Sequence, residues 1–364
     1  MNPRPPVTST HSPAPIAAPG QKWPPAGAAP EGPRRDGARG MAGHEGGGGG
    51  VGGWARAAGL WGGAAAAAAA LWLAVAWGAA AGAEGSEEDR EERARLRAAY
   101  ADMAAGFRSG GVDAAAVSGC TRYFGGLAEG AGEWRAAWPR EYASLSPPLP
   151  FPSVRLAVFP LADSPQLRNG AAAAAAAVAR ALPPETVCHL QPPNSLHVSV
   201  FFVSHPSDVC TDTVHRAPHE VAGSSDGLAP SAEAVALERE AVRDTLERAQ
   251  RRPKMLVERV TFARSGTLLL LFVEEGGMVR NLRSDLREAL PGAPAKQPNI
   301  LHASLLRLLS PTTLPADAVE RVDRVCDEWT QRLQGQAWEP EYLWFVLERE
   351  FATVSGEKTL YRLQ

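Results

Sequence analysis

An eight-residue segment occurs twice in this chain, and it constrains the fold more than any other feature of the sequence. Residues 193–200 read PNSLHVSV and residues 298–305 read PNILHASL, so five of the eight positions are identical. Both copies open apolar strand-like stretches, and a helix-forming stretch precedes each of them. Self-similarity of this kind indicates two related structural units. We therefore expect an α/β (α+β) domain of two pseudo-symmetric lobes, whose antiparallel sheets face a central groove.

The repeated segment carries a His-x-Ser motif in each copy. Residues i and i+2 of a strand lie on one face, about 6.6 Å apart. His197 and Ser199 therefore share a face in the first copy, as His302 and Ser304 do in the second. Two lobes related by a pseudo-twofold axis would present all four side chains to the same groove.

These residue types suit chemistry at phosphorus. Histidine titrates near neutral pH, so one imidazole can act as a general base while the other, protonated, acts as a general acid. Each serine hydroxyl can hydrogen-bond a non-bridging phosphate oxygen, which makes a phosphate cradle without a metal. We expect neither a metal nor another cofactor. The duplicated flanks favour this interpretation over two histidines that merely pack within a sheet.

Two further features lie close to the first motif. Strand alternation places Phe201 on the motif face, where a nucleobase could stack on it. The alternative is that Phe201 packs under the loop of residues 205–227. A third His-x-Ser tripeptide begins at His205, but Pro206 removes a ladder donor, so we attribute this match to chance.

The twin motifs, 105 residues apart, resemble those of the 2H phosphoesterase superfamily, and the resemblance covers about residues 153–364. That superfamily includes bacterial RNA ligase-like proteins, plant cyclic phosphodiesterases and the U6 small nuclear RNA phosphodiesterase. The resemblance implies a metal-independent phosphoric diester hydrolase that acts on a 2′,3′-cyclic phosphate or an RNA-terminal phosphodiester. It implies that His197 and His302 are catalytic and that Ser199 and Ser304 bind the phosphate. A catalytically silent, membrane-tethered nucleotide-binding module of the same fold remains the alternative.

The rest of this region predicts alternating strands and helices in a single domain, residues 151–364, which we expect to act as a monomer. The predicted strands are residues 154–159, 195–204, 255–263, 267–274, 299–308, 342–351 and 358–363, and the predicted helices are residues 166–182, 232–250, 278–290 and 314–333.

The N-terminal part of the chain predicts three further segments. Residues 1–56 are rich in Gly and Pro, and we expect them to be disordered. Residues 57–83 carry no charge and are long enough for a single-pass membrane anchor. A membrane location is therefore favoured, and the sequence leaves the orientation of this anchor in the membrane undecided. Alternatively, they form a signal peptide cleaved near Ala83, which gives a secreted protein, or part of an organelle transit sequence. Residues 84–150 predict juxtamembrane helices, at 87–107 and around Trp134–Tyr142, followed by a linker.

Composition excludes several classes of function. The net charge of −3 argues against a polycation that binds long nucleic acid, so we expect a small nucleotide or an RNA terminus as the partner. The four cysteines have no zinc-binding spacing, and they fit buried thiols or two disulfides. The sequence contains no phosphate-binding P-loop, no G-x-S-x-G elbow and no H-E-x-x-H motif.

Overall fold

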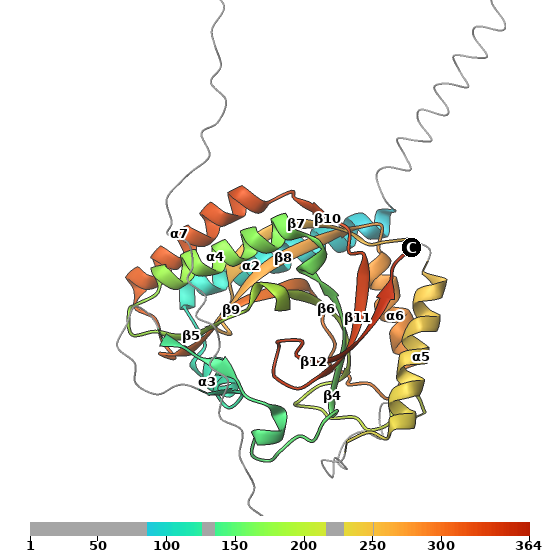
Figure 1. Ribbon diagram of the computed structural model, residues 1–364. Coiled ribbons are helices and arrows are strands. Elements are labelled where there is room, and N and C mark those ends of the chain that lie inside the picture. The colour runs from blue at the N-terminus through green and yellow to red at the C-terminus, as the bar shows by residue number, and fades with distance from the viewer. Residues whose placement is uncertain (1–85, 126–134, 216–228, 250) are drawn as a thin grey trace, which may run out of the picture. The chain divides into compact units, whose positions relative to one another are not determined.

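The computed structural model describes residues 86–125, 135–215, 229–249 and 251–364, and a ten-stranded sheet with helices packed against it dominates this part of the chain (Figure 1). The antiparallel α/β class expected from the repeat is confirmed. The Gly/Pro-rich tail of residues 1–56 and the uncharged run of residues 57–83 lie outside the described residues.

Eight strands follow one another across the sheet, and all of their pairings are antiparallel. Two more strands, β2 and β5, continue from β9, and the β2–β5 pair is parallel. In spatial order the path is β10 (Ala337–Trp338), β7 (Lys254–Phe262), β8 (Thr267–Glu275), β9 (Leu301–Ser310), β6 (His197–Ser204), β4 (Val154–Pro160), β11 (Tyr342–Glu348) and β12 (Gly356–Arg362). The strand β5 (Val187–Leu190) pairs with β9, and β2 (Arg135–Ala136) pairs with β5. A separate two-stranded sheet consists of β1 (Phe124–Gly125) and β3 (Trp138–Pro139).

The two halves of the sheet meet at the two motif strands. β9 and β6 share a single registered pair, Val198 with Ala303. Beyond that point β9 pairs with β5 instead, while β6 continues along β4. The two halves of the sheet are thus joined through the strands that carry the His-x-Ser motifs.

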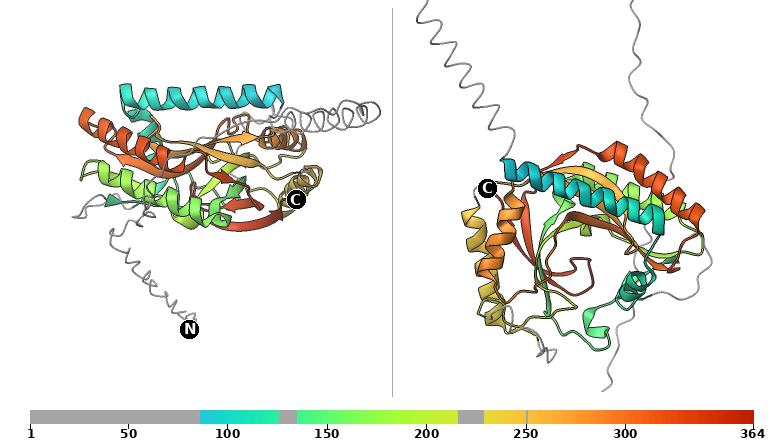
Figure 2. Two further views of the ribbon diagram at one scale, coloured as in Figure 1. Left: turned by 90° about the horizontal axis from the view of Figure 1, so that it is seen from above. Right: turned by 180° about the vertical axis from the view of Figure 1, so that it is seen from behind.

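The longer helices form two groups on the sheet. α2 (Glu87–Gly110), α4 (Pro165–Ala181) and α7 (Ala316–Leu333) lie side by side over the β7, β8 and β9 region (Figure 2). α5 (Ala232–Arg248) packs on α6 (Met278–Ala289), which contacts β6 and β8. Short elements complete the chain: α3 (Ala114–Thr121) and the 3₁₀ turns η1 (Tyr142–Ser144), η2 (Leu161–Asp163) and η3 (Pro193–Ser195).

The helix predicted at residues 87–107 belongs to the folded domain. It begins with a capping box, in which Ser86 and Asp89 satisfy each other's main-chain amides. One stripe of α2 is buried and includes Leu96, Tyr100 and Phe107, and the Phe107 ring lies 5.0 Å from that of Phe262 on β7. This burial makes α2 part of the hydrophobic core that supports the sheet.

The prediction of a helix around residues 134–142 is wrong for residues 135–142, which are the part of this segment that the structure describes. Residues 135–144 form β2, β3 and η1 instead. Pro139 lies within the expected helix, where it removes a hydrogen bond and clashes with the preceding turn. The side chain of Trp138 is 61% exposed, whereas Tyr142 is buried.

The expected membrane location also requires correction. Within the described residues, none of the helices combines the length and apolar character needed to cross a bilayer. The run of residues 57–83, on which the expectation rested, is outside that part of the chain.

The four cysteines are all described, and none of them forms a disulfide.

Candidate active site

The two His-x-Ser motifs lie on adjacent antiparallel strands, and their side chains line one pocket. Since Val198 pairs with Ala303, antiparallel register places His197 opposite Ser304 and Ser199 opposite His302. In ideal ladder geometry, opposed residues have Cβ atoms about 4.5–5.5 Å apart, and diagonal neighbours such as the two histidines lie about 7–8 Å apart. All four motif side chains line the same pocket.

Each motif is followed by a β-bulge, so the bulge is duplicated together with the motif. On β6 the extra residue is Val200, directly after the motif serine. On β9 the extra residue is Leu305, again directly after the motif serine. A bulge reverses the alternation of faces along the rest of its strand. As a result, the fifth residue after each histidine joins the motif face, and these residues are Phe202 and Arg307, which both line the pocket.

The expectation that Phe201 lies on the motif face is wrong for this reason. Phe201 is 1% exposed and belongs to the main hydrophobic core, where the guanidinium carbon of Arg287 lies 5.3 Å from the centre of its ring. Phe202 takes the place expected for Phe201. The sequence holds a signal for this arrangement, because each motif serine is followed by two consecutive apolar residues before the chain returns to the pocket.

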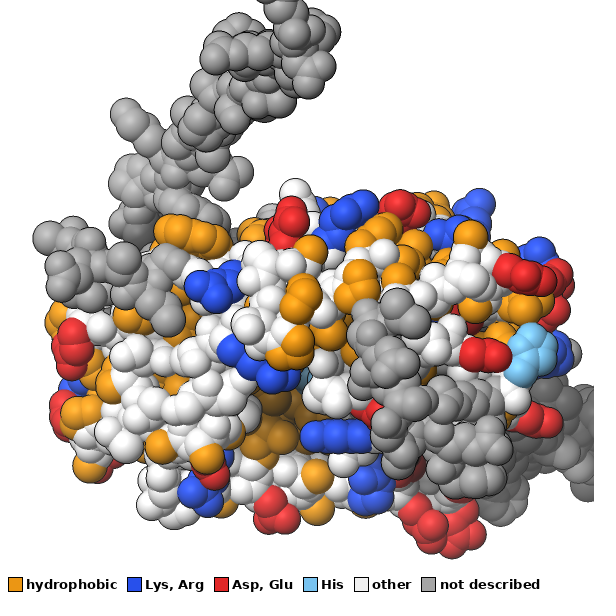
Figure 3. All heavy atoms as spheres, turned by 90° about the horizontal axis from the view of Figure 1, so that it is seen from below, with side chains coloured by type: hydrophobic (Ala, Val, Ile, Leu, Met, Phe, Trp, Pro, Cys, Tyr) orange, Lys and Arg blue, Asp and Glu red, His pale blue; other side chains and the backbone are white. Residues whose placement is uncertain are grey.

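The pocket holds a cavity of about 100 Å³ between β4, β6, β9 and the end of β11. Sites that enclose a drug-sized ligand typically measure roughly 300–1,000 Å³, so this cavity suits a small group with the rest of its molecule outside. Figure 3 shows one face of the protein with a hollow whose floor is largely hydrophobic and whose rim carries Lys and Arg side chains. The lining residues of the pocket are Tyr142, Val154, Leu156, His197, Ser199, Phe202, Ser204, His205, Pro206, His302, Ser304, Arg307, Glu348, Phe351 and Ala352.

The two motif histidines are both held in the neutral form. The Nδ1–H of His197 donates to the Ser195 carbonyl at 2.8 Å, which leaves Nε2 as the unprotonated nitrogen. The Nδ1 of His302 is buried, and no hydrogen-bond partner for it lies among the described residues. The pKa of His197 is lowered to about 4 and that of His302 to about 3, mainly by burial and to a smaller extent by the Arg307 charge.

Arg307 brings a positive charge to the pocket, and analysis of the sequence missed it. Its guanidinium lies 3.4 Å from the Ser304 hydroxyl and 3.4 Å from the Thr267 hydroxyl, with its carbon 5.0 Å from the centre of the Phe351 ring. Burial lowers its pKa, and no hydrogen-bond partner for its buried Nε lies among the described residues. An incompletely satisfied guanidinium beside a motif serine is suited to receive an anion.

A buried hydrogen-bonded pair forms another wall of the pocket. The Tyr142 hydroxyl donates to the Glu348 carboxyl at 2.7 Å, and the Val354 main-chain amide donates to the other oxygen of that carboxyl at 3.0 Å. Burial raises the pKa of Glu348 to about 7 and raises that of Tyr142 well above its usual value. This wall is therefore only partly charged near neutral pH, which limits its repulsion of an anion at Arg307.

The third His-x-Ser tripeptide also reaches the pocket, although not from a motif strand. His205 follows β6 in a turn, where its Nδ1 lies 2.7 Å from the Ser207 hydroxyl. Its ring centre lies 4.9 Å from that of Phe202, so the two rings form an aromatic rim. As expected, Pro206 keeps this tripeptide out of a strand, because β6 ends at Ser204. His205 nevertheless lines the pocket.

The fold and the pocket thus define an α/β protein in which two histidines and two serines of a repeated motif line one small pocket together with Arg307. No protein-family model matches the chain. No curated protein matches it either.

Solved structures that are similar to part of it include the following two. A conserved protein of unknown function from Agrobacterium tumefaciens has 14% sequence identity and a TM-score of 0.39, over 57% of this chain and 84% of that one. Usb1 of Kluyveromyces marxianus has 11% identity and a TM-score of 0.35, over 58% of this chain and 98% of that one.

Proposed function

We propose that this protein is a phosphodiesterase in which the two motif histidines supply general acid and general base catalysis. The observation that carries the proposal is the convergence of both His-x-Ser motifs on one pocket. Two imidazoles on diagonal positions of a ladder can both reach a single phosphate, which is the geometric requirement for shared acid–base work.

The chemistry follows from the positions of these groups. One imidazole takes a proton from a water molecule, whose oxygen forms a new bond to phosphorus. The other imidazole, protonated, gives its proton to the ester oxygen as the bond from phosphorus to that oxygen breaks. The Ser199 and Ser304 hydroxyls donate to the non-bridging oxygens, and the Arg307 guanidinium balances their negative charge. A cyclic phosphodiester and water thus become a phosphomonoester.

The small cavity favours a substrate whose phosphate enters while its base stays at the rim. A 2′,3′-cyclic phosphate at a nucleotide or an RNA terminus meets this requirement, because a single water and a single leaving ribose oxygen complete the reaction. Phe202 and His205 supply aromatic faces at the rim on which a base can stack.

The proposal is tested with the full chain and a panel of 2′,3′-cyclic mononucleotides, 3′,5′-cyclic mononucleotides and short RNAs that end in a cyclic phosphate. We expect hydrolysis of the 2′,3′-cyclic ends, at a rate unchanged by EDTA because both proton transfers use side chains. Binding without hydrolysis across the whole panel would refute the proposal and identify a nucleotide-binding module. Complete loss of activity in EDTA would refute the two-histidine mechanism.

The pH dependence of the reaction should reflect the burial of the histidines. Catalysis needs one protonated and one neutral imidazole, yet with pKa values of about 4 and 3 both are neutral in the free enzyme at pH 7. Because kcat/KM reports the free enzyme, we expect kcat/KM to increase by roughly tenfold for each unit by which the pH falls from 8 to 5. The bound diester anion raises both pKa values, so the kcat profile should lie at higher pH.

The same shifts affect stability, which must be followed in parallel. Both histidines have a lower pKa in the folded than in the unfolded protein. Their contribution to the stability of the fold is therefore fully present above about pH 6.5, and it is lost as the pH falls toward their pKa values in the folded protein. Melting temperatures measured over the same pH range define where the enzyme is folded. A kcat/KM that falls between pH 7 and pH 5 in folded protein would contradict the prediction.

A further inference from the structure

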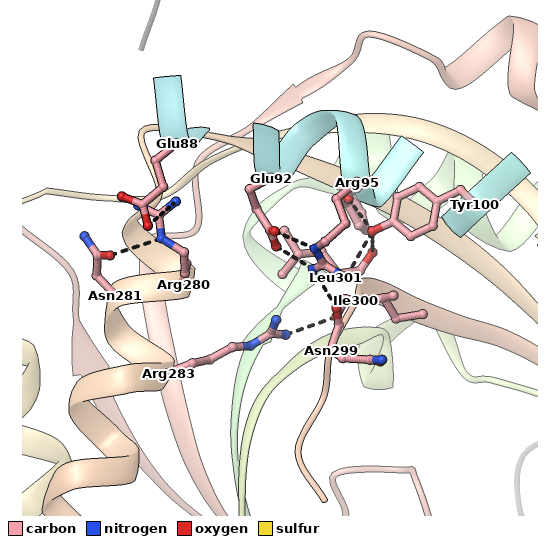
Figure 4. A network of polar contacts seen from close by, with 11 residues as sticks. Glu88, Glu92, Arg95, Tyr100, Arg280, Asn281, Arg283, Asn299, Ile300 and Leu301 are labelled. Atoms are coloured by element: carbon pink, nitrogen blue, oxygen red, sulfur yellow. Dashed lines mark hydrogen bonds and ion pairs between the residues drawn. The ribbon is translucent and has the colours of Figure 1, made fainter. Parts of the chain in front are cut away.

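An arginine on α6 contacts β6 and the residue directly before β9 from outside the pocket. Arg283 Nε donates to the Val200 carbonyl at 3.0 Å, and its Nη2 donates to the Ser199 carbonyl at 3.2 Å. The same Nη2 donates to the Ile300 carbonyl at 3.0 Å, two residues before His302 (Figure 4). Arg283 lines a separate cavity of about 180 Å³ between α2 and α6, so it does not reach the proposed substrate directly.

The motif strands have few main-chain hydrogen bonds of their own at this point. They share one registered pair, and the bulge at Val200 follows immediately on β6. The extra residue of a bulge is left out of the ladder, so buried carbonyls there need other donors. Arg283 supplies the donors for the bulge of β6 and for the entry to β9 with one rigid, planar group.

This use of a half-buried arginine is costly for stability. Within the described residues, all the hydrogen bonds of the Arg283 guanidinium go to main-chain carbonyls rather than to a carboxylate. Burial lowers its pKa to about 10, despite the attraction of Glu274. A partly buried charge without a bonded counter-charge costs free energy, and such departures from packing rules are expected at functional sites.

The N-terminal helix α2 holds the same stretch of β9 from a second direction. The Tyr100 hydroxyl donates to the Phe272 carbonyl at 2.7 Å and accepts from the Leu301 amide at 3.2 Å. Arg95 reaches the Asn299 carbonyl at 3.4 Å (Figure 4). The backbone directly before His302 is therefore fixed on both sides. Arg283 connects it to β6 at the bulge, and the Gln297 side chain connects the preceding segment to the Phe202 main chain with two hydrogen bonds of 2.8 Å.

We propose that Arg283 is a positioning residue, which sets the spacing of the two motif strands and thereby the separation of the two imidazoles across the phosphate. The proposal rests on the proposed function, and it assigns to a residue outside the pocket a role in the chemical step. Since a misplacement of about 1 Å can cost roughly 10²-fold in rate, loss of this connection should affect turnover more than binding.

The test compares Arg283→Met with Arg280→Met in the full chain. Arg280 lies one turn away on α6 and forms ion pairs with Glu88 and Asp89 of α2, but it makes no hydrogen bond to either motif strand among the described residues. We expect Arg283→Met to lower kcat by about 10- to 100-fold with KM changed by less than about threefold. Arg280→Met should leave both constants within about twofold. Arg283→Lys, which keeps the charge but not the planar fork, should give an intermediate kcat.

Amide hydrogen exchange provides a second readout that does not need activity. Peptides covering residues 197–204 and 300–306 should exchange faster in Arg283→Met than in wild type or Arg280→Met. A folded Arg283→Met variant with wild-type kcat and wild-type exchange would overturn the proposal while the proposed function stands. If wild type itself has no activity, the proposed function fails, and the exchange comparison still decides whether Arg283 fixes the strands. If Arg283→Met does not fold, the kcat of Arg283→Lys decides, and a wild-type value would overturn the proposal.

Discussion

Replacing either His197 or His302 with alanine should lower kcat on a 2′,3′-cyclic phosphate by about 10²-fold or more, which is the usual loss when a general acid or base is removed. Both side chains line the pocket from adjacent strands, so each variant removes one of the two proposed proton-transfer groups. Because the two act as one unit, the double variant should be little slower than either single variant. Steady-state kinetics at a fixed pH measure all three variants.

The control for the histidine variants is His215→Ala. The His215 side chain is 66% exposed and does not line the pocket, so its loss should leave kcat unchanged. A single alanine variant at His197 or His302 that folds like wild type and keeps full turnover would contradict acid–base catalysis by this pair. Binding of inorganic phosphate should survive in the single variants, because the serines and Arg307 remain.

Replacing Arg307 with methionine should lower kcat/KM by about 10²- to 10³-fold, comparable to the loss of an oxyanion-stabilising donor. The guanidinium lies 3.4 Å from the Ser304 hydroxyl, and among the described residues that line the pocket Arg307 is the one Lys or Arg. Arg307→Lys should recover part of the activity, because it restores the charge without the forked donors. Kinetics on a cyclic mononucleotide and isothermal titration with phosphate measure the effect on turnover and on binding.

Arg307 also has an electrostatic signature that a purely structural residue would lack. Its charge lowers the pKa of both motif histidines, so its removal should raise them and move the pH dependence of kcat/KM toward neutral pH. Arg349→Met is a matched control, because its guanidinium also lies over an aromatic ring, that of Phe151 at 3.8 Å, but outside the pocket. An Arg307→Met variant with an unshifted pH profile and less than a tenfold loss would exclude the proposed role.

The repeat in the sequence predicted that the four motif side chains share one pocket, because similar motifs on equivalent strands are expected at equivalent places in two related units. Strand alternation then failed at one step. It assumed a regular ladder after Ser199, whereas the Val200 bulge reverses the faces and replaces Phe201 with Phe202. Arg307 was missed for the same reason, since regular alternation from His302 points its side chain away from the motif face.

The contribution of the N-terminal segment could not be predicted from local sequence. The helix at residues 87–107 is visible from its composition, but its apolar stripe does not specify what it packs against. Only the tertiary structure shows that Tyr100 reaches the main chain of Leu301, and that the Tyr142 hydroxyl bonds to Glu348 in the pocket wall. Such long-range polar contacts leave no periodic pattern in the sequence.

The duplicated bulge has a consequence for the direction in which a substrate can be bound. A pocket built from two copies of one motif is nearly symmetric, and its histidines and serines alone would accept a phosphodiester in either of two orientations. The residues that the bulges turn toward the pocket are unlike each other, with a phenyl ring on one side and a guanidinium on the other. Phe202 and Arg307 therefore give the pocket a polarity, and their difference would determine which ester oxygen faces which histidine.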